Sequence, residues 1–484
     1  MSLPPLLQEL LPHLLAVLTV LTSLVGSGHA VLHKRDVRAA VGWVGLIWLV
    51  PLVGALLYVL LGVNRIRRAG KTLGMGRGLL AHAPSVDPCP PERLASRVPR
   101  AEHLAPLVRL AGSVVRRPLL PGNRITALDG GDAAYAAMLK AIDGAQHTIS
   151  LCTYIFDNDA MGRRFVEALA RAQARGVEVC VLIDSVGMRY SLPSISWRLR
   201  RARLPHALFL RSFLSFRIAF LNLRNHRKIL VVDGRLGFTG GINIRSSFAE
   251  HRGRPARGRD LHFKVEGPVV AHLQEVFAED WAFTTREVLE GEEWFPPLAP
   301  VGTALARGIS DGPDEDFESL RMLLLGALAS ARESVRIVTP YFLPDAALNT
   351  ALNVAALRGV RVDLILPEKG NLPVVQWASR AQLWQVLEPG CRVYLTPPPF
   401  DHTKLMVVDG VWGLVGSANW DPRSLRLNFE FDVELYDPDF ARQLDAMVEA
   451  RLEVARPLTL AEVDARSLPV KLRDGLARLL SPYL

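Results

Sequence analysis

The feature that most constrains the fold of this 484-residue chain is an internal repeat. An apolar run at 148–154 is followed by a helical stretch and then by a second run at 174–184, which opens on an Arg-Gly-Val turn. The second half repeats this order, with runs at 334–341 and 357–366 and the same turn sequence. Strand, helix and strand joined in this way form a βαβ unit. A repeat of this length predicts a duplicated α/β domain, because solenoid units are much shorter.

Each half also carries one histidine motif, in which His-x-Lys is followed by Asp after four apolar residues and then by a glycine-containing turn and Asn. In a strand, residues i and i+2 face the same side, so the His and Lys of each motif project together. The motif members are His226, Lys228, Asp233 and Asn243 in the first half, and His402, Lys404, Asp409 and Asn419 in the second.

These residue types suit displacement at a phosphodiester, which needs a nucleophile and an acid for the leaving oxygen. Imidazole can fill both roles near neutral pH, so one histidine would attack phosphorus and the other would protonate the leaving alcohol. The two lysines and two asparagines would hold the phosphate and stabilise its developing charge. We expect no metal and no other cofactor, since the sequence shows no carboxylate cluster for a metal ion.

A reacting histidine needs an acceptor for its other ring nitrogen, and two acids are candidates for this orienting role. Asp260 and Glu430 each follow the asparagine of their half, at the start of a strand-like run. Asp233 and Asp409 complete the expected catalytic set, although we expect them to brace turns more than to take part in the chemistry.

The N-terminus contains two apolar stretches without Asp, Glu, Lys or Arg, at 10–32 and 39–63. Each is long enough to cross a bilayer, which takes about 20 residues. A cleaved signal peptide is disfavoured, because the first ten residues contain Glu9 and no basic residue. We therefore expect a two-helix transmembrane hairpin, kinked at Pro51. Basic residues are more numerous after the second stretch than between the two, which favours a cytoplasmic position for the rest of the chain.

Composition adds few limits. The formal charge of +9 favours anionic partners, either nucleic acid or acidic lipid. The four cysteines are far apart, which argues against a disulfide framework or a zinc site. The expected domains are 1–70 for the hairpin, 71–122 for a proline-rich extended linker, 123–295 and 296–456 for the two repeat domains, and 457–484 for an amphipathic tail. The leucines of this tail suit either packing on the catalytic domain, which we favour, or a helix lying on a membrane.

At these motifs the chain resembles the phospholipase D superfamily, and within it the bacterial cardiolipin synthases. The resemblance extends to 48–62, to the segments 223–228 and 238–243, to Pro-Tyr-Phe-Leu-Pro at 340–344 and to Leu-Asn-Phe-Glu at 427–430. It implies two tandem α/β/α sandwich domains packed face to face, with one shared site. It also implies transfer of a phosphatidyl group between two phosphatidylglycerol molecules at a bacterial cell membrane. His226 would be the nucleophile, His402 the acid/base, and Asp260 and Glu430 their orienting partners.

The sequence departs from this family in one segment beside the expected site. The family often has a tryptophan two residues before the position of Asp260, where this chain has Gly258 in an arginine-rich stretch. Other functions share the motifs, namely a phospholipase that uses water as acceptor, a transferase with another alcohol, and a nuclease. The apolar N-terminus disfavours the nuclease, so we expect a lipid partner and no nucleic acid. A non-catalytic scaffold is disfavoured because both motifs are intact.

Overall fold

The computed structural model describes residues 5–34, 37–62, 84–210, 223–250, 255–313 and 318–481. The chain divides into two units, an N-terminal one and a larger one that begins after it and contains both halves of the repeat. We describe each by itself.

Among the described residues of the N-terminal unit, one helix has the length and composition to cross a membrane. This is α1 (Pro5–His33), of which residues 10–33 have a mean hydropathy of 1.8. The expected two-helix hairpin is wrong, because the second apolar stretch is not one continuous helix. It forms α2 (Val37–Leu49), α3 (Val53–Leu57) and the π-helical turn η1 (Tyr58–Gly62). The 13 residues of α2 rise only about 20 Å, short of the roughly 30 Å of a hydrocarbon core.

The break in the second stretch has a local cause. Pro51 lacks the N–H that a helix interior requires, and the next residue, Leu52, takes a φ of 63°. Gly54 then lies so close to α2 that a Cβ there would meet the carbonyl oxygen of Leu46 at 2.4 Å. A kink was expected at this proline, but the chain instead turns back against α2.

The described part of the larger unit contains one sheet of sixteen strands and a separate two-stranded pair, β8 with β14. The strands of the first half are β1 (Leu120–Asp129), β2 (Thr148–Thr153), β3 (Glu178–Asp184), β4 (His206–Phe209), β5 (Arg224–Asn225), β6 (Ile229–Val232), β7 (Leu236–Gly240), β8 (Gly258–Arg259) and β9 (Leu261–Glu266). Those of the second half are β10 (Ala304–Asp311), β11 (Ser334–Val338), β12 (Arg361–Pro367), β13 (Arg392–Thr396), β14 (Phe400–Asp401), β15 (Leu405–Val408), β16 (Trp412–Gly416), β17 (Asn428–Tyr436) and β18 (Arg456–Leu458).

The strand order confirms the duplicated α/β domain. The first half runs β4-β3-β2-β6-β7-β9-β1, and the second half runs β13-β12-β11-β15-β16-β17-β10 in the matching positions. The two βαβ units predicted from the repeat are β2-α8-β3 and β11-α12-β12, each with parallel strands. Antiparallel pairing of β1 with β10 joins the two halves into the single sheet.

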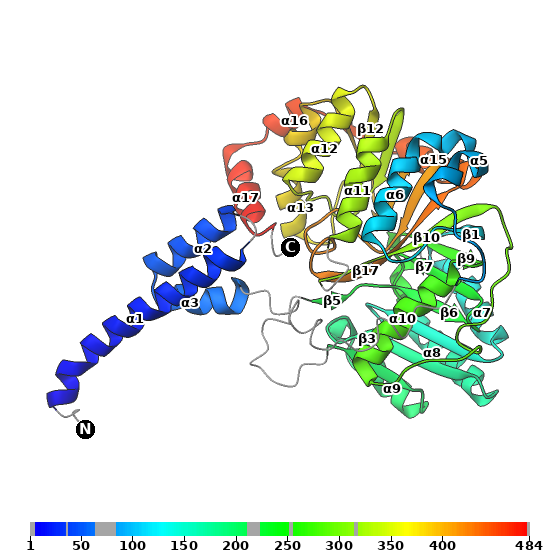
Figure 1. Ribbon diagram of the computed structural model, residues 1–484, viewed down its shortest axis with the longest axis horizontal. Coiled ribbons are helices and arrows are strands. Elements are labelled where there is room, and N and C mark those ends of the chain that lie inside the picture. The colour runs from blue at the N-terminus through cyan, green and yellow to red at the C-terminus, as the bar shows by residue number, and fades with distance from the viewer. Residues whose placement is uncertain are drawn as a thin grey trace. The chain divides into compact units, whose positions relative to one another are not determined.

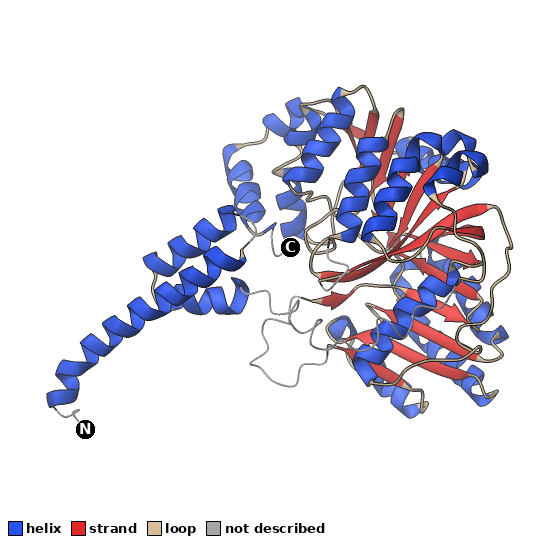
Figure 2. Ribbon diagram, in the orientation of Figure 1, coloured by secondary structure: helices blue, strands red, loops and turns tan. Residues whose placement is uncertain are grey.

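Helices cover the sheet on its outer faces and also lie between the two halves, as Figures 1 and 2 show. The helices of the first half are α7 (Gly130–Gly144), α8 (Ala160–Ala174), η4 (Gly187–Tyr190), α9 (Ile195–Arg201), η6 (Ser246–Phe248) and α10 (Val270–Thr285). Those of the second half are α11 (Ser319–Ser330), α12 (Ala346–Leu357), α13 (Pro373–Arg380), α14 (Trp384–Leu387), α15 (Pro438–Leu452), α16 (Leu460–Asp464) and α17 (Leu468–Leu479).

Three apolar cores follow from this layering. One lies under α7, α8 and α9 in the first half, and another under α11 and α12 in the second. The third combines residues from both halves, including Phe263, Phe431, Trp281 of α10 and Phe440 of α15. Strands covered on both faces are apolar throughout, which explains the continuous apolar runs in the sequence.

The segment expected to be an extended linker is folded over its described part, residues 84–122. It forms η2 (Pro91–Arg93), α5 (Leu94–Arg97), η3 (Pro99–Leu104) and α6 (Ala105–Val114) before β1 begins. Prolines stand in the first turns of η2, η3 and α6, where a missing N–H costs nothing. The apolar residues of this segment pack into the core of the second half that lies under α11 and α12. The start of the expected linker, 71–83, lies outside the described residues.

The C-terminal segment packs on the second half. α17 lies against α13, where Ala477 is buried and Arg473 stacks over Trp377 at 4.6 Å. A row of leucines on α17 and at its C-cap remains exposed: Leu468, Leu472, Leu476, Leu479 and Leu480. Packing accounts for one face of this helix and leaves the apolar face in contact with solvent.

Candidate active site

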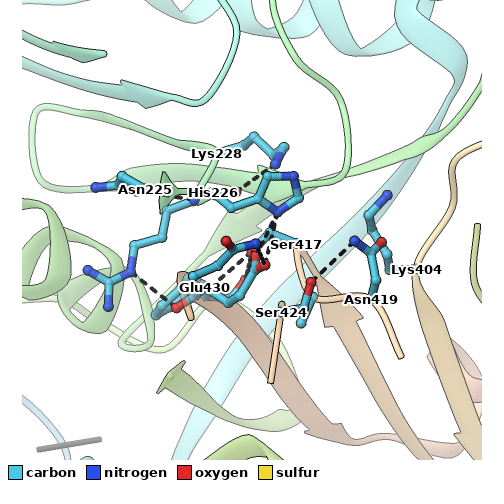
Figure 3. A network of polar contacts seen from close by, with 12 residues as sticks. Asn225, His226, Lys228, Lys404, Ser417, Asn419, Ser424 and Glu430 are labelled. Carbon is cyan, nitrogen blue, oxygen red and sulfur yellow. Dashed lines mark hydrogen bonds and ion pairs between the residues drawn. The ribbon is translucent and has the colours of Figure 1, made fainter. Parts of the chain in front are cut away.

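The short strand β5 carries the first histidine into the second half of the molecule. It pairs in parallel with β17, with Asn225 opposite Phe429. The N–H of His226 then donates to the carbonyl of Phe429 at 2.9 Å. Because the register continues by one residue, His226 lies beside Glu430. Its Nδ1 is 2.9 Å from Oε2 of that carboxylate, and Figure 3 shows the two side chains meeting.

The strand pair β14–β8 gives the second histidine the mirror arrangement. Asp401 lies opposite Arg259, and the N–H of His402 donates to the carbonyl of Arg259 at 2.7 Å. Asp260 follows, and its Oδ2 lies 2.7 Å from Nδ1 of His402. We call each histidine with its carboxylate a dyad. Each dyad therefore takes its histidine from one half and its acid from the other.

The dyads are buried and act on one another. The exposed fractions are 8% for His226 and 7% for His402, and both carboxylates are fully covered. Burial lowers the pKa of His226 to about 4, against the opposing effect of Glu430. Burial also lowers the pKa of His402, and the nearby charges of Lys404, Lys228 and His226 lower it further. With Nδ1 engaged, Nε2 is the ring nitrogen left for chemistry.

The two carboxylates differ in their surroundings. Glu430 also accepts hydrogen bonds from Ser417 Oγ at 2.6 Å and Asn428 Nδ2 at 3.0 Å. Burial acts to raise the pKa of Glu430, but His226, Lys228 and the Ser417 hydroxyl outweigh it and the pKa is lowered. Burial raises the pKa of Asp260 to about 7, against the opposing charge of Lys404.

One substitution within the repeat explains this difference. Where the second half has Ser417, the first half has Gly241, at the same position of the turn. A Cβ on Gly241 would lie 2.2 Å from Oδ1 of Asp260, so the carboxylate occupies the space of a side chain. Asp260 therefore cannot receive the hydroxyl donor that Glu430 has.

Both motif lysines are buried beside the dyads. Lys228 donates to the backbone carbonyl of His226 at 2.6 Å and lies over the ring of Tyr154 at 5.8 Å. Lys404 donates to the carbonyl of His402. Burial lowers the pKa of Lys228 to about 7 and that of Lys404 to about 8. Carboxylates in the dyads oppose this effect, so the ammonium groups remain the counter-charge for a bound anion.

The two motif asparagines are placed differently by their partners. The Oδ1 of Asn243 accepts from the N–H of Ile155 at 3.1 Å, which leaves its amide N–H groups as donors. Asn419 Nδ2 contacts Ser424 Oγ at 3.2 Å. Figure 3 shows Asn419 and Lys404 side by side near the first dyad.

The two motif aspartates lie at turns. Asp233 accepts from the backbone N–H groups of residues 146, 147 and 148, and Asp409 accepts from those of 332, 333 and 334. Both have a positive φ, of 51° and 52°. His103 adds a contact to Asp409 at 2.7 Å. Each carboxylate thus ties the turn after its motif strand to the start of the first strand of its βαβ unit.

Sequence reasoning missed the aromatic residues against the dyads. Tyr154 packs edge-on to His226, with ring centroids 5.1 Å apart, and Tyr341 packs edge-on to His402 at 6.1 Å. Tyr154 follows β2 directly and Tyr341 comes three residues after β11, so each ring lies just past the first strand of its βαβ unit, but the two are offset by one position in the repeat. Phe248 also contacts His402, and a Cβ on Gly258 would lie 3.2 Å from Phe248. The glycine that departs from the family pattern therefore leaves room for this phenylalanine.

Buried ion pairs fix the two motif strands, and these also escaped the sequence analysis. Arg227, the middle residue of the first motif, pairs with Asp280 of α10 at 2.6 Å. In the second half the arginine and the acid change places, since Arg451 of the helix α15 pairs with Asp401 next to the motif histidine at 2.7 Å. Within the part of the chain that the structure describes, no His, Cys, Asp or Glu group of three or more is arranged to hold a metal.

Comparison with known proteins agrees with this geometry. The family model described as "Cardiolipin synthase, PLD-like domain" matches residues 138–281 and 324–452. These two segments contain both histidine motifs and make up more than half of the chain. The chain belongs to this family. The finding confirms the resemblance inferred from the motifs.

Relatives in the family are similar over nearly the whole chain. A cardiolipin synthase of Geobacillus thermodenitrificans (strain NG80-2) is 32% identical over 94% of this chain and 90% of its own length. Cardiolipin synthase A of Pseudomonas aeruginosa (strain LESB58) is 35% identical over 95% of this chain and 94% of its own length. The crystal structure of phosphatidylserine synthase from Haemophilus influenzae Rd KW20 shares the fold, with a TM-score of 0.61 at 16% identity over 78% of this chain and all of that one.

Proposed function

We propose that this chain is a cardiolipin synthase, which transfers a phosphatidyl group from one phosphatidylglycerol to another and releases glycerol. The observation that carries the proposal is the pair of buried dyads, each built across the two halves and flanked by a lysine. Membership of the cardiolipin synthase family supports the choice of reaction.

In the first step, Nε2 of His226 attacks the phosphorus of the donor. A P–N bond forms and the bond from phosphorus to the glycerol oxygen breaks. His402 gives its proton to that oxygen, and glycerol leaves. Lys228, Lys404 and the amide donors of Asn243 and Asn419 offset the charge that develops on the phosphate oxygens.

In the second step, a hydroxyl of the acceptor phosphatidylglycerol gives its proton to His402 and its oxygen attacks phosphorus. The P–N bond breaks, His226 returns to its neutral form, and cardiolipin is released. Two phosphatidylglycerol molecules thus yield one cardiolipin and one glycerol, with no net change in protons.

The difference between the dyads supports His226 as the nucleophile. A fully ionised Glu430 stabilises the positive charge that a histidine gains when it attacks. A dyad that exchanges a proton near neutral pH suits the acid and base steps, and the Asp260 carboxyl has a pKa of about 7. These are the environments of His226 and His402 respectively.

The place of action that we propose is the bacterial cell membrane. α1 would anchor the chain through its single apolar span, and the catalytic unit would lie on the cytoplasmic side. The basic residues that favour this side, at 65–77, lie outside the described residues. The anionic phospholipid substrate accounts for the positive charge of the chain.

The test is to incubate detergent-solubilised protein with phosphatidylglycerol alone and to identify the lipids by mass spectrometry. Cardiolipin and glycerol are expected from the wild type, and neither from His226→Ala or His402→Ala. Phosphatidic acid in place of cardiolipin would identify water as the acceptor and the protein as a phospholipase. If both variants formed as much cardiolipin as the wild type, the assignment of the site would be refuted.

A further inference from the structure

A pocket of about 230 Å³ lies next to the second dyad and has no role in the chemistry described above. It lies at the carboxyl ends of the parallel strands β11, β12 and β13, under α13, α16 and β18. Ligands of open α/β sheets bind at this edge. Its apolar wall is formed by Leu366, Leu372, Val375, Leu383 and Leu395.

The polar wall of the pocket is cationic. Three arginines line it, Arg380, Arg456 and Arg466, against one acid, Glu462. Arg456 pairs with Glu368 and Glu462, and Arg466 pairs with Asp474. These pairs leave one arginine that has no such partner.

Arg380 is that arginine. It is half-buried, and its guanidinium donates to the backbone carbonyl of Glu368 at 3.1 Å. Among the described residues, no carboxylate lies within 4.0 Å of it. Burial and the neighbouring charges of Arg466, Arg473 and Arg456 lower its pKa, although Asp474 opposes them. A half-buried cation without a carboxylate partner beside an apolar wall is suited to an anionic amphiphile.

Tyr341 connects the pocket to the reaction. Tyr341 is one of the residues that line the pocket, and its ring packs on His402 at 6.1 Å and on Phe400 at 6.2 Å. The pocket and the acid/base histidine therefore share this residue as a neighbour.

The proposed reaction brings together two phosphodiesters. The phosphate that reacts is held by the motif lysines and asparagines, so the phosphate of the second phospholipid needs another counter-charge. That charge must lie about one glycerol unit from the attacking hydroxyl. The pocket is too small for a whole lipid, since sites for drug-sized ligands begin at about 300 Å³.

We propose that this pocket binds the head group of the acceptor phospholipid, with its phosphate at Arg380 and its free hydroxyl directed past Tyr341 to His402. The acyl chains stay outside, along the exposed rim at Leu372. The inference rests on the transferase function proposed above and adds the place where the second phospholipid binds.

The experiment separates the two chemical steps in the full-length protein, with phosphatidylglycerol in detergent micelles. Arg380→Gln removes the cation and keeps a donor for the Glu368 carbonyl. Arg442→Gln is the matched control, on the exposed face of α15. The rate of phosphohistidine formation is measured by rapid quench, and cardiolipin and phosphatidic acid are measured by mass spectrometry.

Arg380→Gln is expected to form phosphohistidine at the wild-type rate. Its cardiolipin formation at limiting phosphatidylglycerol should fall about ten-fold or more, with phosphatidic acid rising as water replaces the acceptor. Arg442→Gln should form phosphohistidine, cardiolipin and phosphatidic acid as the wild type does. An equal fall in both steps, or no change in either, would overturn the proposal. If the wild type makes no cardiolipin, it is the transferase function that fails.

A second variant tests the pocket independently of Arg380, and two competitors test whether its ligand is a lipid head group. Leu372→Trp narrows the rim at a half-exposed position and leaves Arg380 in place, so it should reproduce the loss of cardiolipin. Inorganic phosphate and short-chain dihexanoylphosphatidylglycerol are then compared as competitors of cardiolipin formation. The lipid should compete at much lower concentration than phosphate, and only its effect should weaken in Arg380→Gln. Equal competition by the two would show a general anion site and overturn the assignment to a lipid head group.

Discussion

At the scale of single residues, the two dyads have the same geometry, but the pKa of Glu430 is lowered and that of Asp260 is raised. Glu430 is held ionised by three side-chain donors, from His226, Ser417 and Asn428. Asp260 has the imidazole of His402 and one backbone N–H, from Leu261. Because one repeat has Ser417 where the other has Gly241, the carboxylate beside His226 receives a hydroxyl donor and the carboxylate beside His402 does not.

Removing the charge of each acid should block a different step. Glu430→Gln should slow phosphohistidine formation by on the order of 10³–10⁴-fold, because the cationic histidine loses its counter-charge. Asp260→Asn impairs His402 in both of its steps; it should slow the release of the intermediate more than its formation, so labelled phosphohistidine should accumulate. Quenching with alkali preserves the P–N bond for counting by gel and mass spectrometry. Accumulation in Glu430→Gln instead would reverse the two roles.

The pH dependence of kcat/KM should be set on its alkaline side by the lysines. The pKa values of Lys228 and Lys404 are lowered to about 7 and 8, so their charges are lost as pH rises through that range, well below the 10.5 of a free lysine. His226, lowered to about 4, stays a neutral nucleophile in weak acid. We expect kcat/KM for phosphatidylglycerol to decline as pH rises through about 7 to 8. A profile that stays flat to pH 10 would contradict this assignment.

At the scale of elements, the strands owe their positions to short polar contacts at their ends. Asp233 and Asp409 each collect three backbone N–H groups at a turn with positive φ. The ion pairs of Arg227 with α10 and of Arg451 with α15 hold the residues next to the histidines. The chemistry thus depends on elements whose own residues do not react.

Asp233→Ala and Asp409→Ala should lower stability more than they change chemistry. Each leaves backbone donors unpaired, so the free energy of unfolding should fall by about 1–3 kcal/mol. Activity per folded molecule should stay within a few-fold of the wild type. Thermal unfolding by calorimetry and cardiolipin formation at low temperature measure the two quantities, with the isosteric Asp→Asn variants for comparison. Lost activity with unchanged stability would place these carboxylates in the reaction.

At the scale of the whole molecule, the active site exists only because the halves exchange strands. β5 extends from the first half to β17, and β14 pairs with β8 of the first half. Neither half alone contains a histidine with its acid. The shared core between α10 and α15 holds the two halves in this arrangement.

The N-terminal unit should be separable from catalysis. A chain that begins at residue 73 keeps the whole larger unit, so it should fold and make cardiolipin from micellar phosphatidylglycerol. It should lose most of its partition into membrane fractions, because α1 is absent. Fractionation after a carbonate wash measures this, with the full-length chain as control. If the shortened chain still binds membranes, the additional variants Leu472→Glu and Leu476→Glu would test the exposed face of α17.

Several parts of the fold could be predicted from the sequence because they depend on local pattern. The repeated βαβ units follow from apolar runs and the Arg-Gly-Val turns. The spacing of His226 and Lys228 was interpreted as strand periodicity, but residues 226–228 lie between β5 and β6 and not in a strand. The second apolar stretch and the proline-rich segment were misjudged for one reason. Composition indicates whether a segment suits lipid or water. A proline, however, acts on the backbone, and whether it ends a helix, as Pro51 does, or begins one, as Pro91 does, depends on where the helix starts.

The sequence by itself determined the duplicated α/β architecture, the two histidine motifs and the acids available to them, because each is written in the spacing of nearby residues. Tertiary structure alone decided which acid meets which histidine. His226 and Glu430 are brought together by the pairing of β5 with β17, and His402 and Asp260 by the pairing of β14 with β8. These pairings join segments far apart in the chain, and their register comes from packing between the halves, which no local pattern records.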